Sequence, residues 1–139
     1  MSIQREIYDA VVRRGYRKGW TADQFAARQV AKLTEEFGEL IDYVHLDHGD
    51  TLDHSTLSWA VMIAAAEGRR VFDDVSQERW AHSSITSPQA AMDELADIVV
   101  VACCLAEALG EIRPDLDTDL MRAALAKASA DVVRGVRAE

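Results

Sequence analysis

The sequence predicts an all-α protein, and three of its features lead to this prediction. Apolar residues recur every three or four positions along most of the chain, which is the spacing that buries one face of an α-helix. No stretch alternates apolar and polar residues as a half-buried strand does. Capping residues and glycines stand near the ends of the periodic stretches. We therefore expect a bundle of four to five helices.

The first half of the chain is expected to hold two of these helices. The apolar spacing predicts a first helix over residues 3–18, and Gly19 is a residue that would close it. A second, unusually long helix is predicted over residues 22–48, with either Thr21 or Asp23 as its N-cap.

A helical insertion is predicted over about residues 49–87. Leu57–Ala64 has the composition of a buried helix, and Val71–Trp80 would hold a further short one. The stretch 83–88 is rich in Ser and Thr and ends in proline, which is typical of a loop. The insertion would either cover a site or build an oligomer interface.

Two more helices are predicted in the last third. One would run over residues 88–109, with Pro88 in its first turn and Gly110 just past its end. A last helix would begin at Pro114 and Asp115. No internal repeat is visible, so we expect residues 1–139 to form one domain.

Composition and charge exclude several classes of protein. The chain has 139 residues, 49% of them hydrophobic, and a formal net charge of −9. Such a charge argues against binding a nucleic-acid polymer or an anionic membrane. The longest apolar run, Ile98–Ala106, is too short to cross a bilayer but should be buried, either in the protein or in an interface. No leader is visible, and the two cysteines, Cys103 and Cys104, are neighbours in a predicted helix, which favours a cytoplasmic location.

Two acidic clusters carry the functional prediction. Glu35, Glu36 and Glu39 fall within one side of the second helix, while Glu94 and Asp97 stand three apart on a later helix. If the two helices pack side by side, the carboxylates converge and repel unless a cation lies between them. All-oxygen ligands favour magnesium, manganese or calcium.

Each cluster also has a plainer interpretation as a solvated helix face. Glu35 and Glu39 lie opposite the apolar stripe of their helix, as in any amphipathic helix. Glu94 and Asp97 are harder to explain in this way, because they lead directly into the apolar run that begins at Ile98. Carboxylates next to a buried face are costly unless they are paired or metal-bound.

These motifs resemble those of the MazG-like, all-α nucleoside triphosphate pyrophosphatases. Lys32–Leu40 is similar to the first motif helix of that family, and Asp93–Ile98 is similar to the second. Lys18–Trp20 and Lys127 fall where relatives carry similar residues. The resemblance covers about residues 15–45 and 88–130, and the connection between the two motifs is much longer here than in compact relatives.

The resemblance implies a hydrolase that converts a nucleoside or deoxynucleoside triphosphate to the monophosphate and pyrophosphate. It assigns Mg²⁺, with Mn²⁺ as a substitute, to four carboxylates: Glu36, Glu39, Glu94 and Asp97. Glu35 would hold or deprotonate the attacking water. The metal would polarise phosphoryl oxygens and neutralise charge on the leaving pyrophosphate.

The resemblance also implies substrate ligands and an oligomer. Lys127 and Lys32 would bind phosphate oxygens, and Trp20 would stack on the base. Ala124 occupies a place where many relatives carry an asparagine. Relatives usually form homodimers or homotetramers, with the site close to the subunit boundary.

Two alternatives stay open. One is a non-catalytic helical oligomer that uses the acids to sense a metal ion or a nucleotide, which the long insertion and Ala124 favour. The other is a different enzyme of the same helical kind, such as a phosphoribosyl-ATP pyrophosphatase.

Overall fold

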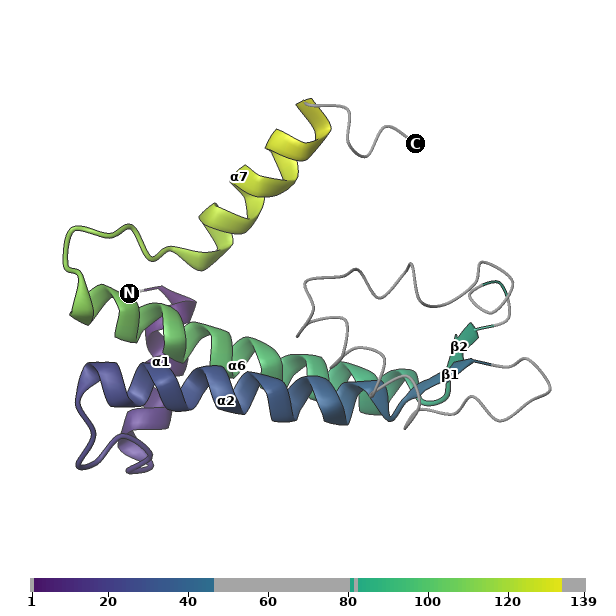
Figure 1. The fold of residues 1–139 in the computed structure, drawn as a ribbon, viewed down its shortest axis with the longest axis horizontal. Helices are drawn as coiled ribbons and strands as arrows, with labels where there is room; N and C mark the ends of the chain where they lie inside the picture. The colour runs from purple at the N-terminus through teal and green to yellow at the C-terminus, as the bar shows by residue number, and fades with distance from the viewer. Residues whose placement is uncertain (1, 47–80, 82, 134–139) are drawn as a thin grey trace. The chain divides into compact units, whose positions relative to one another are not determined.

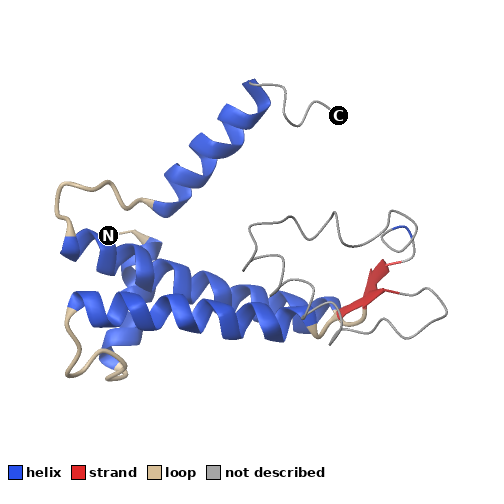
Figure 2. Ribbon diagram, viewed as in Figure 1, coloured by secondary structure: helices blue, strands red, loops and turns tan. Residues whose placement is uncertain are grey.

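In a computed structural model that describes residues 2–46, 81 and 83–133, the protein is mainly helical (Figures 1 and 2). The described elements are α1 (Ile3–Arg13), α2 (Ala22–Ile41), β1 (Val44–Leu46), β2 (Ser83–Ile85), α6 (Pro88–Ile112) and α7 (Leu120–Val133). The predicted all-α class is confirmed at this level, with one short strand pair in addition. Of the described helices, none is long and apolar enough to span a bilayer.

The chain divides into two compact units. One consists of residues 1–33 and 99–139, and the other of residues 34–98. The helices α2 and α6 each contribute a segment to both units. A single domain over residues 1–139 stays a prediction, and the two units are described separately below.

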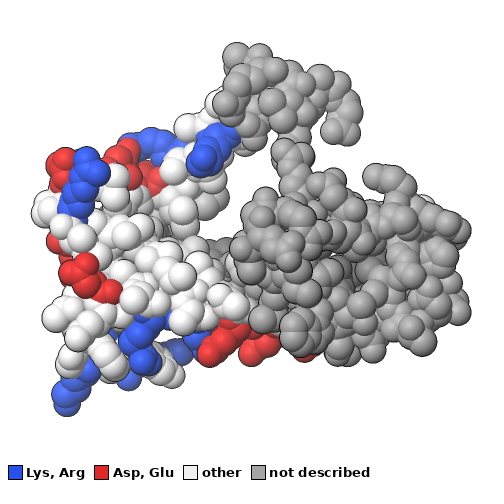
Figure 3. Space-filling view, in the orientation of Figure 1, with Lys and Arg blue, Asp and Glu red and all other residues white. Residues whose placement is uncertain are grey.

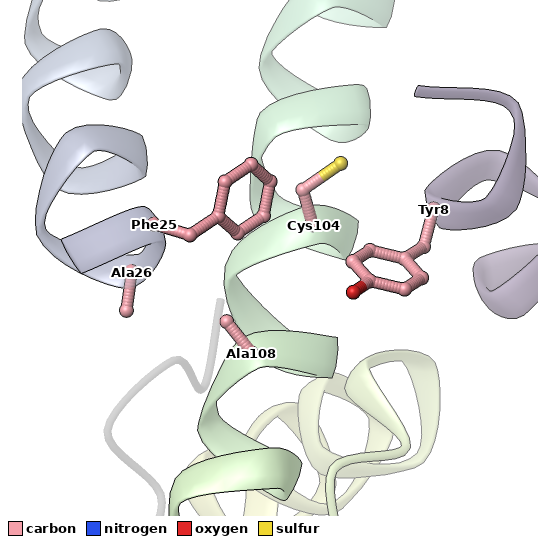
Figure 4. Close-up of a cluster of buried hydrophobic side chains, with 5 residues drawn as sticks. All are labelled: Tyr8, Phe25, Ala26, Cys104 and Ala108. Carbon is pink, nitrogen blue, oxygen red and sulfur yellow. The ribbon is translucent and has the colours of Figure 1, made fainter. Parts of the chain in front are cut away.

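The first unit has a small core in which aromatic rings pack against α6. Cys104 lies between the rings of Phe25 from α2 and Tyr8 from α1 (Figure 4). The two ring centroids are 6.2 Å apart in an edge-to-face arrangement. Burial raises the pKa of the Cys104 thiol to about 11, so this side chain is a neutral packing group at physiological pH.

Ion pairs tie the segment after α1 to α6 in the same unit. The guanidinium of Arg17 lies 2.6 Å from a carboxylate oxygen of Glu111 and also donates to the hydroxyl of Tyr8. It packs over the Phe25 ring, 5.5 Å from the centroid. The hydrogen bond from Arg17 lowers the pKa of Glu111, which keeps this carboxylate ionised.

The first helix is shorter than predicted. It ends at Arg13 rather than near residue 18. Gly15 and Gly19 adopt φ angles of +84° and +86°, in the left-handed region that glycine enters without a Cβ penalty. Two such residues four positions apart interrupt the helical backbone, so the chain turns here.

The second helix begins as predicted but ends earlier. The Thr21 hydroxyl accepts from the Gln24 backbone N–H at 3.2 Å, and the Gln24 side chain accepts from the Thr21 N–H at 3.0 Å. This reciprocal pair confirms Thr21 as a cap. The helix ends at Ile41, not at residue 48, because the chain then enters β1.

The strand pair corrects the expectation that the chain holds no strand. β1 and β2 are antiparallel, with Val44 opposite Ile85. The Tyr43 carbonyl next to β1 also accepts from the Thr86 N–H at 2.9 Å. Strands of three residues are too short to produce a readable alternation, and their pairing joins positions far apart in sequence.

The predicted insertion is described only at its end. Residues 49–80 and 82 lie outside the described residues, and so do the two helices predicted there. The predicted loop over 83–88 instead contains β2, followed by the first residue of α6.

The second motif helix extends past its predicted end. The Ser87 hydroxyl accepts from the Ala90 N–H at 3.3 Å, and Pro88 occupies the first turn as predicted. Gly110 does not terminate α6, which runs to Ile112. A Cβ at Gly110 would lie 3.3 Å from the Thr118 hydroxyl oxygen, so this glycine allows the chain after α6 to approach closely.

The last helix begins later than predicted, at Leu120 rather than at Pro114. A carboxylate oxygen of Asp119 accepts from the Arg122 N–H at 3.0 Å, which makes Asp119 the effective cap. The Asp117 side chain accepts from the Asp119 N–H at 3.1 Å and stabilises the preceding turn. Pro114 lies within the connection that leads to this turn.

The apolar run from Ile98 is only partly buried within the chain, so the alternative that an interface covers the rest of it stays a prediction. Val101, Cys103, Cys104 and Ala106 are buried, whereas Val99 is 46% exposed.

Gln4 fixes the start of α7. Its amide nitrogen donates to the Thr118 carbonyl at 2.7 Å and to Glu107 at 2.8 Å, while its oxygen accepts from the Leu120 N–H at 2.9 Å. We expect Gln4→Met to lower the free energy of unfolding by about 1–3 kcal/mol, because part-buried polar groups lose their partner. Chemical denaturation measures the change.

The matched control is Gln89→Met on α6. Gln89 makes one exposed bond, to Asp93 on its own helix, so its loss should change stability by about 0.5 kcal/mol or less. Equal effects of the two substitutions would show that Gln4 does not hold the start of α7.

Candidate metal centre

Four carboxylates converge in the unit formed by residues 34–98. They come from Glu36 and Glu39 on α2 and from Glu94 and Asp97 on α6. Each side chain offers one oxygen, and these four oxygens all lie within 4.8 Å of one another. Among the described residues this is the one group of potential metal ligands so closely spaced.

Local structure explains why the four side chains meet. On each helix the two acids are three positions apart, so both project from the same side. The β1–β2 pair connects the end of α2 to the start of α6, because Val44 follows α2 closely and Ile85 precedes α6 closely. Because β1 and β2 are antiparallel, the helical segments that flank this pair run in opposite directions.

The four carboxylates differ in exposure. Glu36 is buried, at 5% exposure, and is the single buried charged residue in the described part of the chain. Glu94 is half-buried, while Glu39 and Asp97 are exposed. The Oε2 atom of Glu94 is buried and accepts no hydrogen bond from any described residue. A buried carboxylate oxygen without a donor carries a desolvation cost that a cation or a proton would relieve.

The electrostatics of the cluster act most strongly on Glu94. A hydrogen bond with Glu39, burial, and the negative charges of Glu39, Asp97 and Glu36 together raise the pKa of Glu94 from its ordinary 4.5 to about 7. Like charges at this distance cannot all ionise cheaply, which favours a proton on one of the carboxylates. Such a proton reduces the repulsion among the carboxylates, as a bound cation would.

The donor set fits a hard divalent cation. All four side chains offer oxygen, which suits Mg²⁺, Mn²⁺ or Ca²⁺ rather than a soft metal that prefers sulfur or imidazole. The unsatisfied Oε2 atom of Glu94 is a separate observation that agrees with such a ligand. Acidic groups also gather on proteins without a metal, and here the shared proton is the competing explanation.

The other predicted site residues lie outside this group of four. Glu35 follows Thr34 on α2 and is exposed. Trp20, Lys32 and Lys127 belong to the other compact unit, and all three are exposed. Their roles as substrate ligands stay predictions, as does the role of Glu35 towards water.

One neighbour of a predicted site residue was not anticipated from the sequence. The guanidinium of Arg28 lies over the Trp20 ring, 4.5 Å from the ring centroid. Trp20 stands in the turn before α2, so helical periodicity does not relate it to Arg28. The guanidinium places a positive charge against one face of the Trp20 ring.

Comparison with known proteins adds no relative. The chain matches no known family, no curated protein and no solved structure. The MazG-like resemblance therefore rests on the motifs in the sequence alone.

The raised pKa of Glu94 predicts how stability depends on pH and metal. The folded state holds this proton more tightly than the unfolded chain, so the group favours folding below about pH 4.5. That contribution is lost as the pH rises through about 7. Since Mg²⁺ binds the deprotonated form, we expect it to raise the melting temperature more at about pH 8 than at about pH 5.5. Thermal unfolding with Mg²⁺ or with a chelator measures this difference.

Glu94→Gln should remove most of the pH dependence of the Mg²⁺ effect. Glu6→Gln, an exposed acid in the first turn of α1, serves as the matched control and should leave it unchanged. A magnesium effect of equal size at both pH values in the native protein would contradict the assignment of the proton to this cluster.

Proposed function

We propose that the protein is a magnesium-dependent nucleoside triphosphate pyrophosphatase of the MazG-like kind. It would hydrolyse a ribo- or deoxyribonucleoside triphosphate to the monophosphate and pyrophosphate. The observation that carries the proposal is the convergence of Glu36, Glu39, Glu94 and Asp97, the residues to which the sequence motifs assign the metal.

The four carboxylates would hold Mg²⁺, with Mn²⁺ as a substitute. Bound there, the ion supplies positive charge that polarises phosphoryl oxygens and offsets the charge of the leaving pyrophosphate. The chain is acidic overall, with a formal net charge of −9, so a polyanionic substrate needs such a cation to approach it.

The remaining steps belong to side chains of the protein. Glu35, exposed on the same helix as Glu36 and Glu39, would orient the attacking water and accept its proton. Lys127 and Lys32 would bind phosphate oxygens. Trp20 would stack on the base through the ring face opposite Arg28.

The proposal includes a setting for the enzyme. We infer a cytoplasmic protein that acts on free nucleotides, not on a nucleic-acid polymer or at a membrane. The resemblance also implies a homodimer or a homotetramer. These inferences follow the charge of the chain and the pattern of its motifs.

A non-catalytic sensor of metal or nucleotide is the second candidate. Ala124 favours it, because no amide stands at the place where many relatives carry asparagine. Purified protein incubated with Mg²⁺ and a panel of triphosphates, including phosphoribosyl-ATP, separates the candidates. An enzyme releases pyrophosphate from at least one member of the panel, whereas a sensor binds without release.

Asp97 provides the test of catalysis. We expect Asp97→Asn to reduce magnesium-dependent pyrophosphate release by about 100-fold or more, because the metal contributes several kcal/mol of charge stabilisation. The circular-dichroism spectrum should stay helical. Asp93→Asn, one turn earlier on α6 and outside the group of four, is the control and should retain activity. Full activity of the Asp97 variant would overturn the proposal.

A second pair of variants separates metal binding from chemistry. Glu36→Gln removes the charge of the buried carboxylate, so calorimetry should show weaker Mg²⁺ binding by about tenfold or more. Glu35→Gln should leave the binding curve nearly unchanged while it lowers turnover. An identical Mg²⁺ isotherm for native protein and the Glu36 variant would exclude Glu36 as a ligand.

A further inference from the structure

Arg17 differs from the other cations of the turn between α1 and α2. Its neighbours Arg13, Arg14 and Lys18 are exposed, and Lys and Arg side chains gather on the surface near this turn, at the lower left of Figure 3. The Arg17 side chain is only 18% exposed. Arginine usually keeps its charged end in water, so the burial of this guanidinium indicates a specific role.

The Arg17 guanidinium contacts α1, α2 and α6 at the same time. It binds both carboxylate oxygens of Glu111 on α6, at 2.7 and 2.6 Å, and donates to the Tyr8 hydroxyl on α1. It also lies over the Phe25 ring on α2. The planar fork of arginine makes these contacts possible together. In the described part of the chain, no other residue of the turn forms a hydrogen bond or an ion pair with α6.

The backbone of Arg17 connects this contact to Trp20. The Arg17 carbonyl accepts from the Trp20 N–H at 3.0 Å. Gly15 and Gly19 lie on either side of Arg17, and both have positive φ angles. Glycine restricts the backbone least of all residues, so the bound guanidinium between these two glycines determines the path of the chain to Trp20. Arg28 then contacts the Trp20 ring.

We propose that Arg17 is a positioning residue for the base of the substrate and acts through Trp20. This role rests on the proposed function, from which it takes the stacking of Trp20 on the base. While the guanidinium is bound to Glu111, the turn holds the Trp20 ring in one place. Less conformational entropy is then lost when a base stacks on the ring, so the nucleotide binds more tightly.

Arg17→Lys changes the contact and preserves the charge. An ammonium can pair with Glu111, but it cannot bind both oxygens and also lie flat on the Phe25 ring. The probes are nucleoside triphosphate analogues with a methylene group between the α and β phosphates, in the presence of Mg²⁺. We expect calorimetry to show about tenfold weaker binding of the analogue that native protein binds best. Inorganic triphosphate, which has no base, should bind equally well to both proteins.

Arg5→Lys is the matched control. Arg5 also pairs with a carboxylate of α6, that of Glu107 at 3.1 Å, and it lies over the Tyr8 ring, 5.0 Å from the centroid. It belongs to the first turn of α1 and not to the turn before α2. This variant should lose stability to a similar extent, which chemical denaturation measures. Its affinity for the analogue should stay unchanged.

A double-mutant cycle determines whether Arg17 acts through Trp20. Trp20→Ala should weaken binding of the analogue, and adding Arg17→Lys should weaken it no further, because the ring to be positioned is absent. A second measurement needs no nucleotide. The indole N–H resonance of Trp20, assigned with Trp20→Phe, should move in the Arg17→Lys spectrum and stay in place in the Arg5→Lys spectrum.

Three results would overturn the positioning role while the proposed function stands. Additive losses in the cycle, or a Trp20 resonance that Arg17→Lys does not move, show that Arg17 does not act through this ring. Equal losses of affinity for the analogue and for inorganic triphosphate show a general defect of the variant. Native protein that binds no nucleoside triphosphate and releases no pyrophosphate would instead contradict the proposed function, and the role of Arg17 with it.

Discussion

In the described part of residues 34–98, the repulsion among four carboxylates is the constraint that the structure must satisfy. Glu36, Glu39, Glu94 and Asp97 place oxygens within 4.8 Å of one another, and Glu36 is buried. Negative charges held this closely must share a proton or bind a cation. The raised pKa of Glu94 is the first of these solutions, and a hard divalent metal would be the second. The same four carboxylates therefore determine how stability depends on pH and provide the proposed metal site.

The helix α6 connects this cluster to the rest of the chain. Its N-terminal part contributes Glu94 and Asp97, while its C-terminal part packs Cys104 and Ala108 against rings from α1 and α2. The ends of the helix are fixed by different means, since Ser87 caps its start and Gly110 admits Thr118 near its end. The exposed apolar side chains Met92, Leu95 and Val99 lie on the opposite side of this helix from Glu94 and Asp97.

Much of this organisation was predictable because it depends on short-range patterns. Thr21 with Gln24 and the Ser87–Pro88 step both follow local rules of helix capping. Spacing of three on each of two helices was enough to predict that the acids share faces. The errors lie at element ends: α2 stops at Ile41 because Tyr43 and Val44 pair with a segment more than 40 positions away. Helical periodicity contains no information about such a partner.

By itself, the sequence determined the helical class, the faces of the helices and the identity of the acids, because side-chain spacing and capping act within a few residues. Only the tertiary structure decided that the acids of α2 and α6 meet. It also decided that Glu36 is buried and that one oxygen of Glu94 has no hydrogen-bond donor in the described part. Gly110 is a further example, since its place in the sequence indicates a helix end, whereas in the structure it lies within α6 with Thr118 close to it. The burial of a side chain and its pKa depend on the residues that pack against it. In this protein those residues come from segments that are distant in sequence.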